Sequence, residues 1–397
     1  MKKFLCLALA LVLALSLAAC GGSASSAPAA STPAAGSTDA GTPSASGSAI
    51  KIGGIGPVTG GAAVYGIAVQ NGAQLAVDEI NAMGGIQFEF NFQDDEHDAE
   101  KAINAYNNLK DWGMQVLMGT VTSTPCIAVV AESSADNIFQ LTPSGSAEDC
   151  IAPDNAFRVC FSDPEQGTLS ADYIAGNSLA AKVAVIYDSS DAYSVGIHDA
   201  FVAEAKVKGL EIVADEAFTA DNKTDFTVQV QKAKDAGAEL VFLPIYYNEA
   251  SLILTQADKS GYKPLFFGCD GLDGLVAVEN FDTALAEGVM LMTPFTAAGT
   301  DEKTATFVKN FKAAYGEDPN QFAADAYDAI YAIKAAIEKA GVTAEMSASD
   351  ICDALKGAFT QITVDGLTGS GITWDAKGAP TKTPAVYVIK DGVYVAA

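Results

Sequence analysis

Residues 182–188 read Lys-Val-Ala-Val-Ile-Tyr-Asp, an apolar run with no polar break between its charged ends. A run of this length predicts a strand that is buried on both faces, as in a parallel sheet covered by helices. Helical spacing follows over residues 194–208, and a second strand is expected at 211–218. The order of strand, helix and strand predicts a parallel α/β unit.

The same alternation extends along the chain on both sides of this unit. Toward the amino terminus the sequence predicts strands at 50–56, 88–92, 116–118 and 138–141, and helices at 64–82, at 99–112 and from Pro125 onward with Thr124 as N-cap. Toward the carboxyl terminus it predicts helices at 224–236 and 249–260, and strands at 239–245 and 265–268. Two successive series of similar size predict two doubly wound α/β domains, which bind ligands at the carboxyl ends of their strands.

The last eighty residues follow a different pattern. An amphipathic helix is expected at 321–340. Residues 362–395 have the turn-rich pattern of short strands that is typical of β-hairpins, with Asp-Gly pairs at 365–366 and 391–392. If this tail is divided between the two domains, several chain segments cross between them. A ligand would then lie in a cleft that opens and closes about those segments.

The first fifty residues are expected to stay outside the folded body. Residues 1–19 begin with two lysines and continue as a short apolar stretch, which predicts a signal peptide. Leu-Ala-Ala-Cys20 resembles the lipobox of bacterial lipoproteins, in which the cysteine becomes the lipidated first residue of the mature chain. Residues 20–49 are otherwise almost entirely Ala, Ser, Gly, Thr and Pro, a composition that predicts a flexible tether.

Charge and composition exclude several classes of function. The 397 residues hold 23 Lys plus Arg against 49 Asp plus Glu, a formal net charge of −26. Such a surface repels phosphate backbones, so no nucleic-acid partner is expected. Beyond the signal peptide and Cys20, the cysteines are Cys126, Cys150, Cys160, Cys269 and Cys352. Five allow at most two disulfides, and we expect most of them to be small buried apolar residues.

The motifs of enzymes and nucleotide binders are missing from the sequence. No P-loop and no G-x-S-x-G elbow occur, and Thr59 stands where a dinucleotide loop starting at Gly54 needs glycine. His97 lies among acidic residues at the expected start of a helix, where helix capping is favoured over metal binding. His198 is expected to be solvated on a polar helix face. We therefore expect no catalysis, no metal and no cofactor.

An ordered set of short motifs spans nearly all of residues 50–397. It comprises Ile52-Gly-Gly-Ile-Gly-Pro57, Thr59-Gly60, Tyr65-Gly66, Asn71-Gly72-Ala73, Ala76-Val-Asp-Glu-Ile-Asn81, Gly84-Gly85-Ile86, Asp94-Asp95, Gly119, Ser123, Thr142-Pro143, Arg158, Gln166-Gly167, Val183–Asp188, Gln256-Ala257 and Trp374-Asp375. In order and spacing it resembles the leucine/isoleucine/valine-type solute-binding proteins of ABC transporters. The resemblance implies a periplasmic-binding-protein fold of type I, with two doubly wound parallel-sheet lobes and a three-stranded hinge. The first lobe would be 50–162 plus 294–366, and the second 163–293 plus 367–397.

The resemblance also implies a set of ligand-binding residues. Ser123 matches the serine that binds the α-carboxylate, close to an expected helix N-terminus that favours anions. Ser144 and Ser146 match positions that offer a backbone carbonyl to the ammonium and a hydroxyl to the ligand. Asp270 matches the acidic residue that pairs with the ammonium, which is glutamate in typical relatives. Three tyrosines match aromatic residues around the cleft: Tyr65 as a lid, and Tyr193 and Tyr246 on the wall.

The function implied is capture of an amino acid, branched-chain or otherwise apolar, outside the cytoplasm and its delivery to an ABC permease and the ATPase of that permease. The protein is expected to be a monomer that is held on the outer face of the cell membrane by lipid on Cys20. Other ligands of the same fold stay open, namely an aromatic carboxylate, an amide or a short peptide. A ligand-sensing accessory to a membrane receptor would share every motif.

Overall fold

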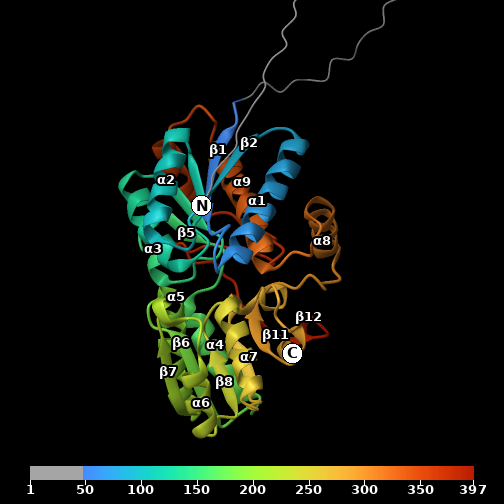
Figure 1. The fold of residues 1–397 in the computed structure, drawn as a ribbon. Coiled ribbons are helices and arrows are strands. Elements are labelled where there is room, and N and C mark those ends of the chain that lie inside the picture. Colours follow the sequence, from blue (N-terminus) through green and yellow to red (C-terminus); the bar gives the residue numbers. More distant parts are fainter. Residues whose placement is uncertain (1–47) are drawn as a thin grey trace, which may run out of the picture. The chain divides into compact units, whose positions relative to one another are not determined.

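The computed structural model describes residues 48–397. The expected signal peptide, Cys20 and all but the last residues of the expected tether lie outside the described residues. Two β-sheets organise the described body, one of five strands and one of seven (Figure 1). Each sheet with the helices packed on it is called a lobe below, the five-stranded sheet belonging to the first lobe and the seven-stranded sheet to the second.

The first sheet is parallel throughout, in the order β2-β1-β3-β4-β5. Its strands are β1 (Ile50–Gly56), β2 (Phe88–Asp94), β3 (Val116–Gly119), β4 (Phe139–Thr142) and β5 (Ala156–Arg158). Its helices are α1 (Ala63–Met83), α2 (Ala99–Trp112), α3 (Ser123–Ala135), α8 (Glu302–Tyr315), α9 (Gln321–Ala340) and α10 (Ala348–Phe359). Ile52 packs toward α1 and α9, whereas Ile55 packs toward α2 and α3. Helices therefore cover both faces of the sheet, as the buried strands predict.

The second sheet has the order β12-β11-β10-β9-β8-β6-β7. Its strands are β6 (Lys182–Asp188), β7 (Glu211–Phe218), β8 (Leu240–Leu243), β9 (Leu265–Gly268), β10 (Met290–Thr293), β11 (Ala385–Lys390) and β12 (Val393–Ala396). Its helices are α4 (Asp163–Gly176), α5 (Ala192–Lys208), α6 (Thr227–Asp235) and α7 (Tyr247–Lys259). Val183 and Val185 pack with the residues of α4 and α5, and Ala184 and Ile186 with those of α6 and α7. Both lobes are thus doubly wound, with helices on each face of the sheet.

The carboxyl-terminal hairpin makes the second sheet mixed. β11 pairs antiparallel with β10 and with β12. Asp391 and Gly392 form the turn between them with φ of 51° and 77°, which is the backbone that Asp-Gly favours in a two-residue hairpin. The other Asp-Gly pair, at 365–366, is followed by only an isolated antiparallel bridge between Val364 and Ile372.

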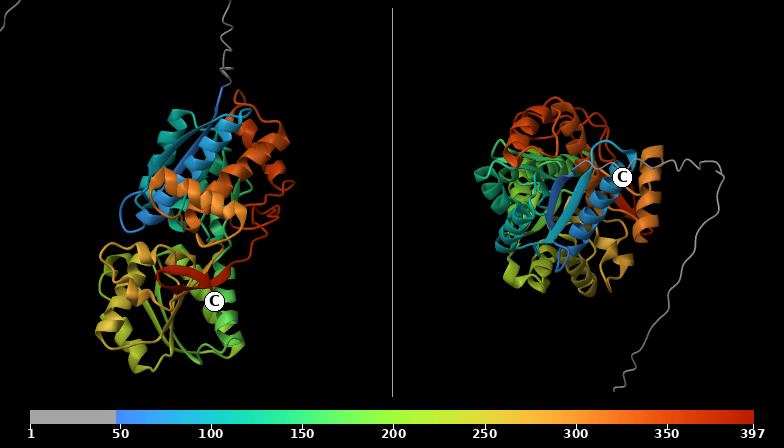
Figure 2. Two further views of the ribbon diagram at one scale, coloured as in Figure 1. Left: turned by 90° about the vertical axis from the view of Figure 1, so that its right-hand side faces the viewer. Right: turned by 90° about the horizontal axis from the view of Figure 1, so that it is seen from above.

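The chain passes between the lobes three times: after β5, after β10 and before β11. The last passage comes later than the expected boundary at 366/367. The backbone N–H of Leu367 donates to Asp328 of α9, Trp374 Nε1 donates to the carbonyl oxygen of Arg158, and Lys382 forms a buried ion pair with Asp325 of α9. Residues 367–382 therefore pack with the first lobe, because these long-range contacts hold them there; Figure 2 shows the segment that then leads to β11.

Helix α3 begins two residues earlier than predicted. Its N-cap is Thr122, which has an extended backbone, and the N–H of Cys126 makes the first helical bond to the carbonyl oxygen of Thr122. Ser123 is therefore the first helical residue, and Thr124 is not the N-cap. Pro125 is tolerated in this first turn because the N–H groups there have no partner within the helix.

A close contact between α1 and α9 stabilises the first lobe. Gly72 of α1 lies so near the backbone of α9 that a Cβ atom added there would be 2.1 Å from the carbonyl oxygen of Ala323. Both helices bury an apolar face, with Ala73, Ala76 and Ile80 on α1 and Ile330 and Ile333 on α9. Only a residue without a side chain allows this approach.

All five cysteines among residues 48–397 are buried and unpaired. Cys126 and Cys150 belong to one small apolar cluster near the start of α3. None of the helices described here combines the length and the apolar character needed to span a bilayer.

Candidate functional site

The predicted site residues meet where the strands of both lobes end. α3 starts with Ser123 after β3, Ser144 and Ser146 follow β4, Tyr193 follows β6, Tyr246 follows β8, and Asp270 follows β9. Tyr65 comes from α1. Six of the seven line one cavity together with Val121, Thr122, Gly271 and Phe322. Ser146 lies just behind Ser123, to whose Oγ its backbone N–H donates over 3.2 Å.

The serines form the first-lobe side of this cavity. Ser123 Oγ accepts from the N–H groups of Ser146 and Ala147, both at 3.2 Å, so its own proton stays available to another acceptor. Ser144 Oγ donates to the carbonyl oxygen of Val121 at 2.6 Å. Ser146 Oγ is buried and has no hydrogen-bond partner among the described residues. Because α3 begins here, its positive end adds to a site that suits a carboxylate.

Asp270 forms the second-lobe side. Its Oδ1 accepts a 2.8 Å hydrogen bond from Tyr193 Oη, and its backbone N–H donates to Gln166 Oε1 at 3.0 Å. Tyr193 also accepts from the N–H of Gly271 at 2.9 Å, and its ring stacks on Tyr246 at 4.9 Å between centroids. The carboxylate is thus held in one orientation by residues from α4, α5 and the end of β9.

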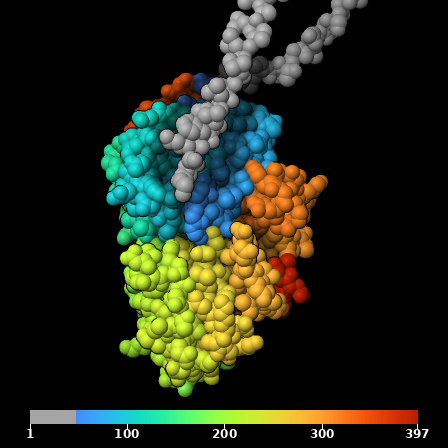
Figure 3. Space-filling model, viewed as in Figure 1, coloured from blue at the N-terminus to red at the C-terminus, as the bar shows by residue number. Residues whose placement is uncertain are grey.

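Tyr65 joins the two lobes across the cavity. Its Oη donates to the carbonyl oxygen of Gly271 and accepts from the N–H of Tyr247, while its ring contacts those of Tyr246, Tyr247 and Phe322. The side chain is completely buried. The lobes are therefore in contact at this point, and Figure 3 shows no wide opening between them on the face that it presents.

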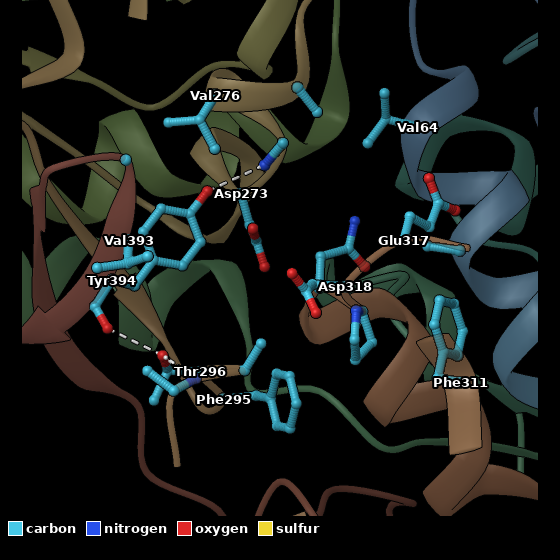
Figure 4. Close-up of a pocket in the computed structure, with 18 of the residues that line it drawn as sticks. Val64, Asp273, Val276, Phe295, Thr296, Phe311, Glu317, Asp318, Val393 and Tyr394 are labelled. Carbon is cyan, nitrogen blue, oxygen red and sulfur yellow. Dashed lines mark hydrogen bonds between the residues drawn. The ribbon is translucent and has the colours of Figure 1, made fainter. Parts of the chain in front are cut away.

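The cavity between these residues measures about 10 Å³, which is room for about one water molecule. A second cavity of about 450 Å³ lies nearby and is drawn in Figure 4. Asp273, Phe295, Glu317 and Val393 line it, and the N–H of Gly274 donates to Tyr394 Oη at its edge. None of the seven predicted residues lines this larger space.

Burial controls the charge of the site. It raises the pKa of Asp270 to about 7, although the hydrogen bond from Tyr193 and the nearby amide of Gln166 oppose the rise. It also raises the pKa of Asp163, a fully buried carboxyl in the first turn of α4. A bound cation would lower both pKa values by favouring the charged carboxylates.

The two histidines differ from expectation in different ways. His97 Nδ1 is 2.9 Å from Thr122 Oγ1, and its ring contacts Tyr246, so it borders the site while Asp98 caps α2 as expected. The sequence predicts a solvated His198, and this prediction is wrong. Its ring is buried, stacks on Tyr187 and hydrogen-bonds Asp215 of the neighbouring strand β7, because the sheet brings these distant residues together.

Three polar residues beside the site were not singled out as site residues from the sequence. Asp163 and Gln166 open α4, and Asp191 is the N-cap of α5, where its Oδ1 accepts from Thr124 Oγ1 of the first lobe at 2.8 Å. The local sequence around Asp163 reads as a helix start, and Ser162 and Glu165 do form a capping box. Within residues 48–397, no three His, Cys, Asp or Glu side chains are grouped as metal ligands would be.

Comparison with known proteins identifies the family to which this chain belongs. Residues 49–393 match the periplasmic binding protein family. The chain belongs to that family. This binding protein is 34% identical over 314 residues to the Leu/Ile/Val-binding protein homolog 3 of Brucella melitensis, an alignment that covers 77% of this chain and 83% of the relative. It is 29% identical to the leucine-, isoleucine-, valine-, threonine- and alanine-binding protein of Pseudomonas aeruginosa, covering 79% and 83% of the two chains.

Solved structures show the same fold. The branched-chain amino acid transporter substrate-binding protein LivJ of Streptococcus pneumoniae, in complex with isoleucine, matches the binding protein with a TM-score of 0.79 at 30% identity, over 88% of this chain and all of the other. A solute-binding protein from R. palustris, in complex with benzoate, matches with a TM-score of 0.78 but only 21% identity, over 88% of this chain and 95% of the other. The second likeness shows that the fold is shared, and the fold alone does not choose the ligand.

Proposed function

We propose that the protein is the extracytoplasmic binding subunit of an ABC importer and that it captures an α-amino acid with a branched-chain or other apolar side chain. The observation that carries this proposal is the opposition of two groups across one cavity. Ser123, at the start of α3, lies on the first-lobe side of the cavity, where it would bind a ligand carboxylate, and Asp270 lies on the second-lobe side, where it would bind the ammonium. The relatives named for leucine, isoleucine and valine support the same ligand class.

This opposition couples binding to closure. A zwitterion satisfies Ser123 and Asp270 together only when the two lobes are close, so it favours the closed form through contacts that the open form lacks. The rings of Tyr65, Tyr193, Tyr246 and Phe322 surround the remaining space and would contact an apolar side chain. Because the cavity is only about 10 Å³, the ligand must enter an opened cleft and displace some of these rings.

Calorimetric titration of the mature protein tests the proposal. Leucine, isoleucine, valine and phenylalanine are titrated beside benzoate, an amide and a dipeptide. We expect saturable heat with at least one apolar α-amino acid and none with benzoate. Binding of benzoate alone, or of no α-amino acid, contradicts the proposal and favours one of the other ligand classes.

We further propose a monomer that is held on the outer membrane face by lipid on Cys20 and that docks on a permease with its ATPase. The Leu-Ala-Ala-Cys20 motif supports the anchor. Radiolabelled fatty acid should be incorporated into the wild-type chain and not into Cys20→Ala. Co-purification with a permease would separate this function from that of a sensor, which would instead co-purify with a receptor.

A further inference from the structure

Two buried cysteines lie close together behind the serine side of the cavity. Cys126 is near the start of α3, and Cys150 is in the short 3-10 helix Glu148–Ile151, which follows the loop after β4. Both side chains are fully buried, and they pack in one small apolar cluster. The two residues are 24 positions apart in the sequence, so the fold of the first lobe is what brings them together.

Both sulfur atoms lie against the residues that form the first-lobe side of the cavity. Cys126 follows Ser123 by three residues, which places both side chains on one face of α3. Cys150 Sγ is 3.7 Å from the carbonyl oxygen of Ser123. A Cβ atom added at Gly145 would be 3.1 Å from Cys126 Sγ, so the loop after β4 passes directly over this thiol. The two thiols therefore sit where α3 and that loop meet.

The two thiols are also chemically different. Contact with Cys150 lowers the pKa of Cys126, because the neighbouring thiol favours the thiolate, whereas burial raises the pKa of Cys150. Cys126 Sγ accepts a further contact from Gln140 Nε2 at 3.5 Å. A thiolate is the reactive form of cysteine, so Cys126 is the nucleophile of this pair.

No other two cysteines of residues 48–397 share an apolar cluster. Cys269 belongs to the core of the second lobe, where its Sγ is 3.7 Å from Ser170 Oγ. Cys352 is on α10, in the main core. Cys160 is near enough for its charge to act on Cys150, but no hydrogen bond joins them. Cys126 and Cys150 are thus the pair that the fold has placed together.

We propose that Cys126 and Cys150 form a disulfide once the chain has left the cytoplasm, and that this bond holds the start of α3 against the loop after β4. The inference goes beyond the proposed ligand. It uses only the extracytoplasmic location of such binding proteins, where disulfides form and persist. The oxidant required is itself a disulfide, either oxidised glutathione or the disulfide of an extracytoplasmic thiol–disulfide oxidoreductase.

The exchange proceeds in two steps. The Cys126 thiolate attacks one sulfur of the oxidant to form a mixed disulfide, and the other sulfur of the oxidant leaves as a thiolate. Cys150 then loses its proton to solvent and attacks Cys126 Sγ, which releases the second thiolate. The two protein thiols together lose two electrons, and the oxidant is reduced to two thiols. Because both cysteines are buried in the folded protein, this exchange occurs while the exported chain folds.

The bond would keep the first-lobe side of the cavity assembled in the absence of a ligand. Ser123 Oγ accepts from the N–H groups of Ser146 and Ala147, both at 3.2 Å, and these are the only side-chain hydrogen bonds between Ser123 and that loop among the described residues. A covalent link from Cys126 to Cys150 closes the chain around both partners. The loop then cannot move far from α3, which lowers the cost of ordering the site when a ligand binds.

Peptide mapping of the chain exported from a bacterial host tests for the bond itself. Free thiols are alkylated under denaturing conditions, and the chain is cut with trypsin. Residues 111–158 contain both cysteines and no Lys or Arg before Arg158, so the bond lies within one peptide. We expect that peptide to be unalkylated and lighter by two hydrogens than its reduced form. Alkylated Cys126 and Cys150, or a link from either to Cys160, which would join two peptides, overturns the inference.

A double variant, Cys126→Ala with Cys150→Ala, tests what the bond does, with Cys269→Ala as the control that removes a buried thiol outside the pair. We expect the thermal midpoint of the double variant to be lower than that of the wild type by about 4 °C or more without reductant. A phosphine reductant should lower the midpoint of the wild type and of Cys269→Ala, and leave that of the double variant unchanged. A wild-type midpoint that does not respond to reductant overturns the stabilising role.

Hydrogen exchange in the ligand-free protein measures whether the loop is held. The amides of Ser146 and Ala147 should exchange more slowly in the wild type than in the double variant, or than in the reduced wild type if that variant does not fold. Equal exchange in a protein that carries the bond overturns this role. None of these measurements uses a ligand, so failure of the proposed amino-acid ligand leaves the inference intact, and absence of the bond leaves the ligand proposal intact.

Discussion

At the scale of single residues, the site is a set of buried polar groups whose charge depends on what is bound. Asp270 is held by Tyr193 and Gln166 but has no cation beside it, which is why burial brings its pKa to about 7. None of the other residues that line the cavity carries a positive charge. A ligand ammonium would therefore be the first positive charge to reach this carboxylate.

Replacing Asp270 tests whether its carboxylate pairs with the ammonium of the ligand. Asp270→Ala should weaken binding of an amino acid by about 2–5 kcal/mol, because it leaves a desolvated ammonium without its partner. The fold should persist, since the carboxylate stabilises no other charge. Calorimetry measures the loss, and circular dichroism checks the fold. Asp235→Ala, at the end of α6, is the control and should bind like the wild type.

The raised pKa of Asp270 also makes binding depend on pH. Below a pH of about 7 the carboxyl of the free protein is protonated and must lose its proton to pair with an ammonium. Affinity should therefore rise between about pH 5.5 and pH 8 and then level off, with protons released on binding near neutral pH. Titrations in two buffers with different ionisation enthalpies measure that release. A flat affinity over this range would mean that Asp270 is already charged in the free protein.

At the scale of elements, the site is made by helices that begin at strand ends. α3, α4, α5 and α7 all start at the cavity or beside it, because each follows a parallel strand or a crossing from one. Only α4 among these four has a side-chain cap. The uncapped first turns of the other three helices leave free N–H groups and positive helix ends at the cleft. These favour a ligand carboxylate and partly offset the negative charge of the buried acids Asp163, Asp191 and Asp270.

The contact between α1 and α9 is sensitive to a single methyl group at Gly72. Gly72→Ala should destabilise the protein by about 1–3 kcal/mol, because the new Cβ collides with the backbone at Ala323 and forces the helices apart. Gly357→Ala is the matched control: Gly357 is in α10 with open space around it, so alanine should stabilise by about 0.5–1 kcal/mol through helix propensity. Denaturant unfolding measures both, and similar effects of the two substitutions would contradict this account of the packing.

The elements could be predicted from the sequence because their signals are local. The apolar run at 182–188 and the Asp-Gly turn at 391–392 both gave the structure they indicate. The seven candidate residues were found through resemblance, and they do lie together. Asp163 could not be found, because its lack of a partner exists only once α4, α5 and the loop after β4 are packed. Two predictions fail for the same reason, because they depend on contacts between distant residues. His198 is buried by its pairing with Asp215 on β7, and residues 367–382 belong to the first lobe because α9 holds them there.

At the scale of the whole molecule, acidity shapes stability. Burial raises the pKa of Asp95 and Asp270 to about 7 and that of Asp273 and Asp325 to about 6. A carboxyl with a raised pKa takes up a proton more readily in the folded state, so its contribution to stability is full at low pH and is lost as the pH rises through the folded pKa. The net charge of −26 adds repulsion that also grows with pH.

The free protein should therefore be more stable in mild acid than at alkaline pH. We expect its thermal midpoint to rise as the pH falls from about 8 to about 5, and to fall again only when capping carboxylates with lowered pKa values, such as Asp301, become protonated. Scanning calorimetry without ligand measures this. A midpoint that declines steadily from pH 8 downward would show that these carboxylates stay charged in the folded state.

Because the chain passes between the lobes three times, cleavage by a protease need not separate the molecule into two parts. A protease that cuts the middle passage, between β10 and α8, leaves two polypeptides, each of which contributes strands or helices to both lobes. The pieces are interlocked through two separate cores and cannot part without unfolding at least one of them. A nicked molecule should run as two bands on a denaturing gel and as one particle on a sizing column, and such tolerance of scission suits a protein exposed outside the cell.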